Sequence, residues 1–375
     1  MSKIKGRLEN SLSSNDLRRY LIQKDETSRV RTNNLSIFKK KINKYCDPIK
    51  KPRVLLISPP ITIPKYMQKR CIPPLGISYV AASLRKSGID VEIFDCCVEG
   101  WDTERESPNG KLITYGVPPR DIFTRIGSLE YDVIGVSVLF STDLPNLYET
   151  TKVIKKNIPK AVVVVGGLHP TIYPEEVLDL DIEYNSARTI DFIIRGEGEI
   201  RFVEFLENLK DGVVDLKAEG LAGVVENKVF VNPQVKTIEK IDELPFPAFD
   251  LLPMEKYFKI NIPFSPVPQG DRVLPMLTTR GCPIGCSFCA NTNTWKMHRK
   301  RSIESIVTEI EYWKEKYNID EIQFADDNLT FDMRHALKKF NAIKDLDILW
   351  CTPNGTMINK LNEEMIEVMA SSGMY

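Results

Sequence analysis

Long apolar runs and an excess of either charge are both missing from this sequence of 375 residues. No apolar stretch reaches the roughly 18 to 20 residues that a helix needs to cross a bilayer, and the polar N-terminus does not resemble a signal peptide. Lysine plus arginine number 51, as do aspartate plus glutamate, so no overall field attracts nucleic acid or an anionic membrane. These absences predict a cytoplasmic protein that has no transmembrane segment and does not bind nucleic acid.

Cysteine is sparse outside one short loop. Three of the eight cysteines fall within residues 278–291, and the remaining five show no spacing typical of a disulfide framework: Cys46, Cys71, Cys96, Cys97 and Cys351. This usage is typical of a reducing compartment. The adjacent Cys96 and Cys97 end an apolar strand, and we expect them to be small buried residues rather than a redox pair.

The loop TTRGCPIGCSFCAN at residues 278–291 carries Cys282, Cys286 and Cys289 in a CxxxCxxC spacing. Three thiolates this close in sequence can surround one inorganic cluster, and such a cluster leaves one iron open to another ligand. A tetrahedral zinc site completed by His298, or three unrelated buried thiols, are the alternatives. Zinc loops usually show a second cysteine or cysteine–histidine pair, and none follows here, so the spacing favours the cluster.

This loop resembles the signature of the radical S-adenosylmethionine (radical SAM) enzymes, in which three cysteines hold a 4Fe–4S cluster. The resemblance implies that the amino and carboxylate groups of S-adenosylmethionine (SAM) chelate the fourth iron and that Phe288 lies near the adenine. It also places Asp327 and Asn328, in the segment FADDN, where the amino group of SAM and the substrate approach. The alternative for residues 326–332 is an acidic turn that caps the following helix.

The segment at residues 273–375 alternates strands with helices, in the order strand, helix, strand, helix, strand, helix. This order predicts the first half of a radical SAM partial (β/α) barrel, whose sites lie at the carboxyl ends of its strands. The family's core has six such units, so we expect a fragment of a longer protein or, as the alternative, a chain completed by another. Arg299 and Arg301 are expected to be solvated surface residues, with neutralisation of cluster or carboxylate charge as the alternative.

Earlier in the chain, short apolar strands alternate with amphipathic helices from Arg53 onward, which predicts a doubly wound parallel α/β sheet. The expected strands are residues 53–58, 91–95, 131–138, 161–167 and 191–199. Ligands of such sheets sit beyond the carboxyl ends of the strands. The candidate ligand loops are therefore residues 59–74, 139–143, 166–171 and 196–199.

Three of these segments, residues 73–88, 164–171 and 192–199, resemble the Rossmann-like cobalamin-binding domain that precedes many radical SAM domains. The resemblance implies that the corrin of cobalamin lies between the sheet edge and the radical SAM domain. The residues implied as cobalamin contacts are Pro74, Gly76, Ser141, Thr142, Gly166, Gly167, His169, Gly196 and Glu197.

The sequence departs from one branch of that family, because it contains no Asp-x-His-x-x-Gly motif to supply a histidine below the cobalt. The resemblance therefore implies a cobalamin without protein histidine coordination, and His169 is expected to be a loop or corrin-edge contact. The alternative for the whole domain is a flavodoxin-like sheet that has lost its ligand and serves as a packing module.

The expected organisation has four parts. Residues 1–51 form an N-terminal extension without assigned chemistry, in which residues 10–23 carry the pattern of a short helix. Residues 52–235 form the cobalamin-binding-like domain and end in a hairpin at residues 220–231. A proline-rich linker covers residues 236–272, and the radical SAM domain covers residues 273–375.

Taken together, the resemblances imply a cobalamin-dependent radical SAM enzyme. Such an enzyme cleaves SAM reductively to a 5′-deoxyadenosyl radical, receives its electron from a flavodoxin or ferredoxin, and here would transfer a methyl group to an unactivated carbon of a small-molecule, natural-product or lipid intermediate. A cyclase or rearrangement enzyme of the same architecture is one alternative. A non-catalytic iron–sulfur electron carrier or sensor with an α/β ligand-binding domain is another. No individual catalytic residue is assigned.

Overall fold

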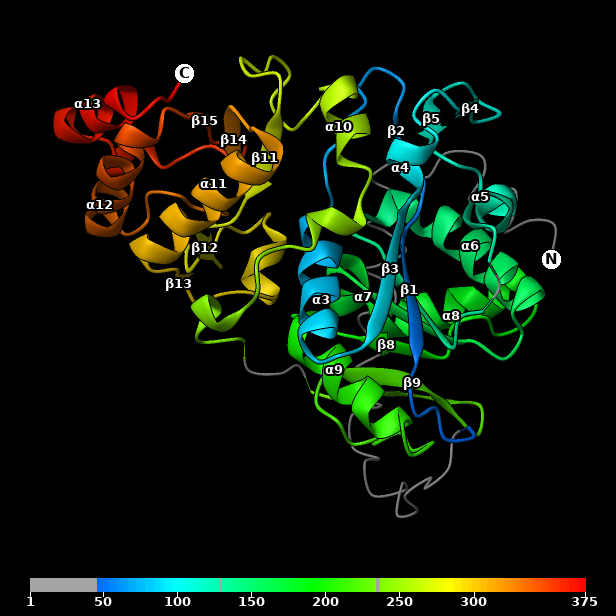
Figure 1. Cartoon of the computed structure of the whole chain (residues 1–375). Coiled ribbons are helices and arrows are strands. Elements are labelled where there is room, and N and C mark those ends of the chain that lie inside the picture. The colour runs from blue at the N-terminus through cyan, green and yellow to red at the C-terminus, as the bar shows by residue number, and fades with distance from the viewer. Residues whose placement is uncertain (1–45, 129, 234–236) are drawn as a thin grey trace.

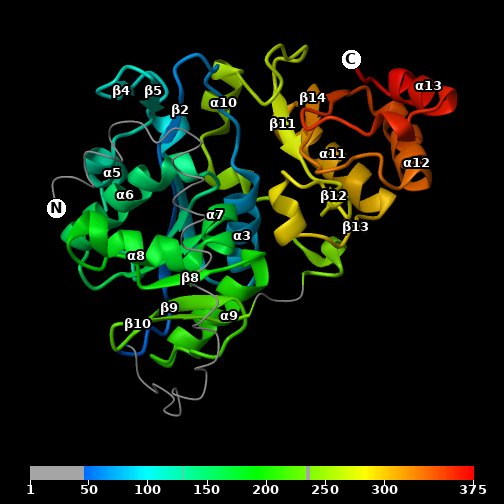
Figure 2. The same ribbon diagram turned by 180° about the vertical axis from the view of Figure 1, so that it is seen from behind.

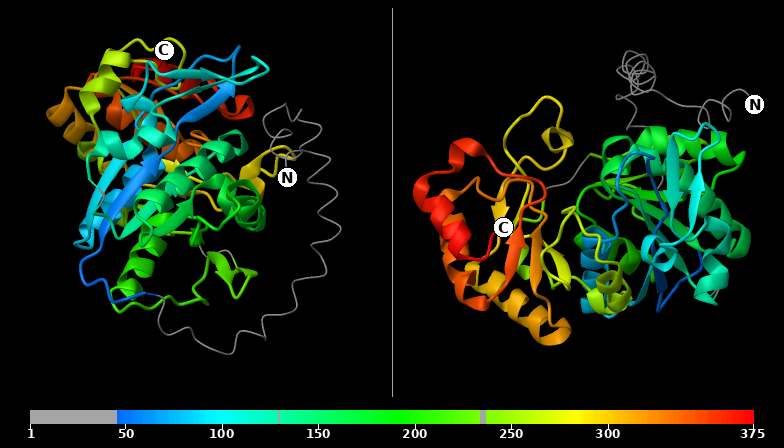
Figure 3. Two further views of the ribbon diagram at one scale, coloured as in Figure 1. Left: turned by 90° about the vertical axis from the view of Figure 1, so that its right-hand side faces the viewer. Right: turned by 90° about the horizontal axis from the view of Figure 1, so that it is seen from above.

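A computed structural model of the chain describes residues 46–128, 130–233 and 237–375 (Figure 1). The helix expected at residues 10–23 lies outside the described residues, as does most of the predicted N-terminal extension. Two units fill the rest, an N-terminal sheet with its helices and a smaller C-terminal sheet with its helices. Seen from above, the two units lie beside one another (Figure 3).

The N-terminal sheet has seven strands in the order β10-β9-β8-β7-β6-β1-β3. Their bounds are β1 Arg53–Ser58, β3 Asp90–Asp95, β6 Val133–Ser137, β7 Val162–Gly166, β8 Phe192–Ile194, β9 Leu221–Val225 and β10 Lys228–Val231. The five strands from β3 to β8 run parallel, and the direction of winding reverses between β1 and β6. The predicted doubly wound sheet is confirmed, and its carboxyl edge at that reversal is where such sheets bind ligands.

The predicted hairpin adds two antiparallel strands, β9 and β10, to the β8 edge of this sheet. Its turn is formed by Glu226 and Asn227, whose φ angles are 50° and 61°. Two residues with positive φ give the turn geometry that fits the right-handed twist of a two-residue hairpin. Among the parallel strands, β6, β7 and β8 are shorter than predicted, whereas β1 has its predicted bounds and β3 begins one residue earlier.

Helices cover both faces of this sheet, and alternate residues of β1 pack against the helices on opposite faces. Val54 and Leu56 pack in one core with α3 and α9, whereas Leu55 and Ile57 pack in a second core with α6 and α8. A strand buried on both faces reads as a continuous apolar run, as β1 does. Figure 1 shows α3 and α9, and Figure 2 shows α6 and α8 from behind. The helix bounds are α3 Leu75–Lys86, α6 Leu144–Asn157, α8 Pro174–Asn185 and α9 Gly198–Leu209.

Shorter elements complete the N-terminal unit. A small antiparallel sheet in the order β2-β5-β4 inserts after β1 and β3. Cys96 and Cys97 are buried at the start of α4, so the prediction that they are small buried residues is confirmed. The bounds are β2 Ile61–Pro64, β4 Glu104–Glu106, β5 Leu112–Tyr115, α4 Cys96–Glu99, α5 Ile122–Ile126 and α7 Leu168–Ile172.

The C-terminal sheet consists of three parallel strands in the order β11-β14-β15, each followed in sequence by a helix. This is the predicted alternation, with Ser302 as the N-cap of α11, where its side chain accepts a hydrogen bond from Ser305 N. The predicted strand at residues 273–281 is interrupted: β11 ends at Met276, and β12 then pairs antiparallel with β13. The bounds are β11 Val273–Met276, β12 Thr279–Arg280, β13 Arg299–Lys300, β14 Glu321–Phe324, β15 Leu349–Cys351, α11 Ile303–Tyr317, α12 Met333–Ile343 and α13 Glu363–Ser371.

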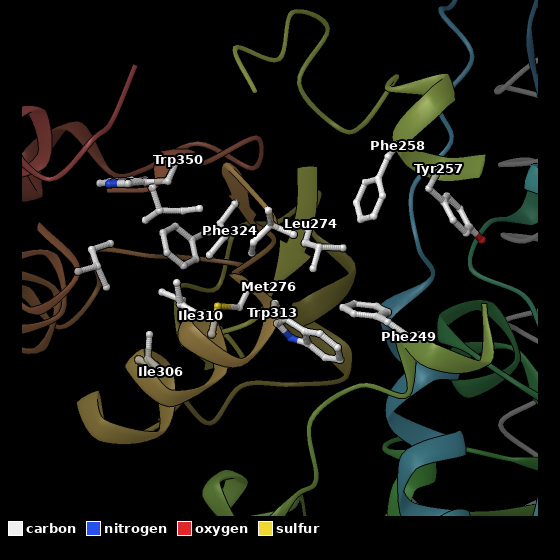
Figure 4. Close-up of a cluster of buried hydrophobic side chains, with 14 of the residues drawn as sticks. Phe249, Tyr257, Phe258, Leu274, Met276, Ile306, Ile310, Trp313, Phe324 and Trp350 are labelled. Atoms are coloured by element: carbon white, nitrogen blue, oxygen red, sulfur yellow. The ribbon is translucent and has the colours of Figure 1, made fainter. Parts of the chain in front are cut away.

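The connector between the units is packed rather than free. Helix α10, Met254–Ile260, and the preceding turn place Phe249, Tyr257 and Phe258 in one apolar core with the C-terminal strands and α11 (Figure 4). The ring of Phe249 lies 5.2 Å from that of Trp313, centroid to centroid. Because aromatic side chains bury large apolar areas, this contact fixes the C-terminal unit against the N-terminal one. The exact domain boundaries remain predictions.

Trp350 offers a test of the C-terminal core. Its ring is fully buried and stacks on Phe340 with centroids 4.6 Å apart, and its Nε1 donates to Ser372 O at 3.0 Å. We expect Trp350→Ala to lower the free energy of unfolding by about 3–5 kcal/mol, because it leaves a cavity. The neighbouring Leu349 is 37% exposed, and Leu349→Ala should lower it by less than about 1 kcal/mol. Urea unfolding followed by circular dichroism compares the two; equal losses would contradict this packing.

Candidate functional site

A cavity of about 420 Å³ lies between the carboxyl ends of the N-terminal strands and the C-terminal unit. This volume is within the range of ligand pockets, about 300–1,000 Å³. Its N-terminal wall comes from the ends of β6, β7 and β8 and from the first turns of α3 and α9. Its C-terminal wall comes from the turn after β11, the approach to β13 and the end of β14. Six predicted cofactor contacts line it: Gly76, Gly166, Gly167, Gly196, Glu197 and Asp327.

Glycines open the N-terminal wall of the cavity. At Gly167, φ is 110°, and a Cβ would lie 2.1 Å from Val138 O, so only glycine lets α7 begin so close to the end of β6. At Gly166 the nearest atom to a Cβ would be Ile194 O at 3.6 Å, and at Gly76 nothing lies within 4 Å. The missing side chains leave room for a large ligand to approach the backbone here.

His169 lies just behind this wall rather than in it. Its Nδ1 is 3.0 Å from Ser141 Oγ, so it links α7 to the loop that follows β6. The ring is buried, and burial lowers the pKa of His169 to about 4, which keeps the imidazole neutral at pH 7. Ser141 and Thr142 are exposed at the same end of the sheet. Their predicted contacts with cobalamin, and that of Pro74, stay predictions.

The cysteine loop begins at a tightly packed glycine. At Gly281, φ is 81° and a Cβ would lie 2.3 Å from Met297 O, while the next residue, Cys282, donates its N–H to Trp295 O at 3.0 Å. The loop is therefore anchored against the segment that returns to β13. Beyond this anchor the side chain of Phe288 is 91% exposed. Other protein atoms therefore do not cover its ring, which leaves the ring accessible for the predicted contact with adenine.

The three thiols of this loop match the donor set of an iron–sulfur cluster. Cys282, Cys286 and Cys289 are each partly exposed, and no disulfide joins any of the eight cysteines, all of which the structure describes. Across the described ranges, no group of three or more His, Cys, Asp or Glu side chains is arranged to hold a metal ion. Three thiols are nevertheless the donor set that an iron–sulfur cluster uses. To bind a cluster, the loop would have to bring the three cysteines closer together. His298, the zinc alternative, packs on Phe331 with ring centroids 4.9 Å apart.

Asp326 joins the end of β14 to the residues that precede this loop. Its buried carboxylate accepts hydrogen bonds from the backbone and hydroxyl groups of Thr278 and Thr279 at 2.5–3.2 Å. Lys339, on α12, donates to Thr278 Oγ1 at 2.8 Å, and burial lowers the pKa of Lys339 to about 8. These groups were not among the sequence candidates. The signal was present, because Lys339 falls on the same helical face as the core residues Ala336 and Phe340.

The three polar residues after β14 point in different directions. Asp326 turns inward to the threonines, Asp327 lines the cavity, and Asn328 Nδ2 lies 3.8 Å from Cys282 Sγ. Further along, Asp332 caps α12 by accepting from His335 N at 3.1 Å. The helix-capping alternative thus describes Asp332, while Asp327 lines the cavity and Asn328 lies beside the cysteine loop. The predicted contacts of Asp327 and Asn328 with SAM stay predictions.

The expectation that Arg299 and Arg301 are solvated is wrong. They are 5% and 6% exposed, because each has a buried carboxylate as its partner. Arg301 pairs with Glu309 of α11, and Arg299 Nη1 lies 2.7 and 2.8 Å from the two carboxylate oxygens of Glu197. Pairing and hydrogen bonding offset the desolvation of the buried guanidinium groups.

Glu197 is the centre of an ion-pair network between the two units. Besides Arg299, it lies 3.2 Å from Arg280 Nη1 and accepts a hydrogen bond from Ile238 N at 2.6 Å. Arg280 Nη2 also lies 2.7 Å from Glu199. Burial lowers the pKa of Arg280, but Glu199 and Glu197 more than offset this, so the pKa is raised overall. Glu197, predicted as a cofactor contact, therefore joins the end of β8 to the residue two positions before Cys282.

Two family models match the chain: the B12 binding domain over residues 69–206 and the radical SAM superfamily over residues 276–374. The chain therefore matches a B12-binding model and a radical SAM model in the predicted order. The first match begins after β1 and ends within α9, and the second covers the C-terminal unit from the end of β11. The predicted cofactors, a 4Fe–4S cluster, SAM and cobalamin, agree with these two families.

Relatives with curated names span both methyl transfer and cyclisation. Cytidylyl-2-hydroxyethylphosphonate methyltransferase of Streptomyces wedmorensis is 33% identical over 346 residues, covering 86% of this chain and 64% of that protein. Anaerobic magnesium-protoporphyrin IX monomethyl ester cyclase of Rubrivivax gelatinosus is 26% identical over 287 residues, covering 74% of this chain and 46% of that protein. The chain therefore spans less than two thirds of the length of these relatives.

A solved structure confirms the fold. The radical SAM methyltransferase TsrM of Kitasatospora setae, with tryptophan and a SAM analogue bound, superimposes with a TM-score of 0.62 at 18% identity, covering 86% of this chain and 58% of that one. The predicted fold class, a Rossmann-like sheet followed by radical SAM βα units, is confirmed. No helix in the parts that the structure describes has the length and apolar character to cross a membrane.

The buried carboxyl group of Asp143, in the loop after β6, predicts how the stability of the folded protein changes with pH. Burial raises the pKa of Asp143 to about 7, and its Oδ1 accepts from Thr62 N at 2.9 Å. Between about pH 4 and 7 the folded state keeps this proton while the unfolded chain releases it, so folded stability falls as pH rises. Asp143→Asn keeps an acceptor for Thr62 N and cannot ionise.

We expect the variant to match the wild type near pH 4 and to exceed its free energy of unfolding by up to about 4 kcal/mol at pH 8. Chemical denaturation at a series of pH values measures the difference. Parallel curves for the two proteins would contradict the buried, proton-binding state of Asp143.

Proposed function

We propose that this protein is a cobalamin-dependent radical SAM enzyme that transfers a methyl group to an unactivated carbon of a small molecule. One observation carries the proposal: a single cavity has the glycine-rich ends of the B12-binding sheet on one side and the start of the cysteine loop on the other. A methyl donor and a radical source must reach the same carbon atom, and this arrangement brings their two binding sites together. The name of the methyltransferase relative supports the same reaction class.

The chain's residues divide the work of holding these groups. Gly76, Gly166 and Gly167 leave the space that the corrin requires, and the three loop cysteines supply the thiolates for the cluster. We assign Asp327 and Asn328 to the amino group of SAM; in support, Asp327 lines the cavity wall and Asn328 lies beside Cys282. When bound, these cofactors supply the reductive cleavage of SAM and the methyl group; the protein positions them.

The apolar lining of the cavity is suited to keeping water away from a bound ligand. Its wall is mainly apolar, with Leu56, Ile77 and Val136 from the sheet side and Leu277 from the other. The buried pairs of Glu197 with Arg280 and Arg299 seal the boundary between the units. A reactive carbon radical is quenched by stray hydrogen donors, so a fixed enclosure that keeps other donors away favours the intended target.

The cyclase alternative shares this architecture, because a cyclase is among the relatives. The phosphonate methyltransferase covers more of the chain at higher identity, which favours methyl transfer. Our proposal specifies the substrate only as a small molecule. The flavodoxin or ferredoxin reductant and the cytoplasmic location remain predictions.

The cluster site is tested by anaerobic reconstitution with iron and sulfide and electron paramagnetic resonance of the dithionite-reduced protein. We expect a 4Fe–4S signal that changes when SAM is added, because one iron is open to it. Cys286→Ala should lose the signal. The matched control is Cys351→Ala, at the buried end of β15, which should keep it. A wild-type signal that ignores SAM would instead favour the electron carrier, and a colourless zinc protein would favour the zinc site.

The cobalamin site is tested by graded filling of the cavity at Gly76. A Cβ there meets no atom within 4 Å, and the residue lies in the first turn of α3, so Gly76→Ala should fold normally and bind hydroxocobalamin nearly as well. Gly76→Phe places a ring in the cavity and should weaken binding at least tenfold. Absorbance titration measures both dissociation constants. Equal affinity for Gly76→Phe and the wild type would place cobalamin elsewhere.

A further inference from the structure

Two hydrogen-bond donors in the cavity wall have no acceptor within the described part of the protein. They are Nη2 of Arg299 and Nε1 of Trp295, and both atoms are buried. Both residues line the cavity, and both come from the radical SAM side, on the segment that returns from the cysteine loop into β13. Buried donors in native proteins nearly always have a partner, so an unpaired couple facing one cavity indicates a missing acceptor.

The surroundings hold both side chains in place. Arg299 Nη1 bonds both oxygens of Glu197 and also Ile238 O at 2.7 Å, which leaves Nη2 as the remaining end of a fixed guanidinium group. The backbone of Trp295 is tied to the cysteine loop through its carbonyl, which accepts from Cys282 N at 3.0 Å. Arg299 therefore cannot turn away to solvent without breaking contacts that join the two units, and the backbone of Trp295 is fixed beside it at the cavity wall.

The chemistry of the missing partner follows from these groups. Guanidinium and indole N–H groups donate and never accept, so the partner presents an acceptor oxygen. The charges of Arg280 and Arg299 are balanced by those of Glu197 and Glu199, and Asp327 adds a further carboxylate to the wall. A wall without surplus positive charge favours a neutral carbonyl oxygen over an anion.

The position of the donors indicates which molecule carries that carbonyl. Arg299 is bound to Glu197, in the turn between β8 and α9, so its free nitrogen lies at the B12-binding side of the cavity. The rim of a corrin carries amide side chains, whose carbonyl oxygens are neutral acceptors. This step rests on the proposed function, since it takes cobalamin as the occupant of the cavity.

We propose that Arg299 Nη2 and Trp295 Nε1 bind amide carbonyl oxygens on the rim of cobalamin. The radical SAM domain then contributes directly to cobalamin affinity, although the B12-binding domain supplies most of the pocket. Cobalamin becomes a bridge between the units, held from below by the glycine turns and from the side by these two donors.

The test is hydroxocobalamin binding to the full chain, measured by absorbance titration. Trp295→Phe removes one N–H and keeps an aromatic ring, and Arg299→Lys keeps the charge for Glu197 but lacks the second amino group. We expect each variant to raise the dissociation constant roughly two- to tenfold, the loss expected for one hydrogen bond. Trp101→Phe makes the same chemical change in the N-terminal unit outside the cavity and should leave the dissociation constant unchanged.

A second measurement separates binding from structure. Because Trp295 Nε1 has no partner in the ligand-free protein, Trp295→Phe without cobalamin should unfold at the same temperature as the wild type. A lower unfolding temperature together with weaker binding would mean that the indole N–H supports the fold, and would overturn the proposal.

The remaining outcomes also decide. If both variants bind hydroxocobalamin like the wild type, the proposal is overturned; weaker binding of SAM alone in those variants would reassign the donors to SAM. If the wild type itself fails to bind hydroxocobalamin, the proposed function falls as well. If the wild type and both variants bind hydroxocobalamin with the same dissociation constant, only the proposed role of Arg299 and Trp295 is ruled out, and the proposed function stands.

Discussion

The buried ion pairs around Glu197 are the interaction on which the rest of the site depends. A carboxylate from the end of β8 is shared between Arg280, next to the cysteine loop, and Arg299, on the strand that closes that loop. Removing any one partner would leave an uncompensated charge in a buried place, which is strongly unfavourable. The distance between the B12-binding edge and the cysteine loop is therefore set by electrostatics as well as by the apolar contact of Phe249 with Trp313.

Much of the fold was predictable because it is local. The apolar run of β1 and the cap at Ser302 can each be read within a few residues, and both lie where predicted. Glycine turns such as Gly166 and Gly167 were likewise found from sequence, because a backbone that must approach another strand or a ligand excludes side chains. The three cysteines were predicted from spacing alone, and their role as cluster ligands stays a prediction.

What sequence reasoning missed depends on contacts between distant residues. The burial of Arg299 requires Glu197, 102 positions earlier, and no periodicity connects the two. The inward turn of Asp326 likewise depends on Thr278 and Thr279, 48 and 47 positions away. A charged residue reads as solvated unless its partner is known, so charge pairing across the units is where the prediction fails.

The two-residue ladder between β12 and β13 has a further consequence for the cysteine loop. Thr279 pairs with Lys300 and Arg280 pairs with Arg299, so both ends of the loop are already fixed at its base. The entropy of bringing distant chain ends together has then been spent during folding, before any iron arrives. Only the internal torsions of the loop remain to be ordered. The ladder therefore reduces the loop entropy that cluster binding has to overcome.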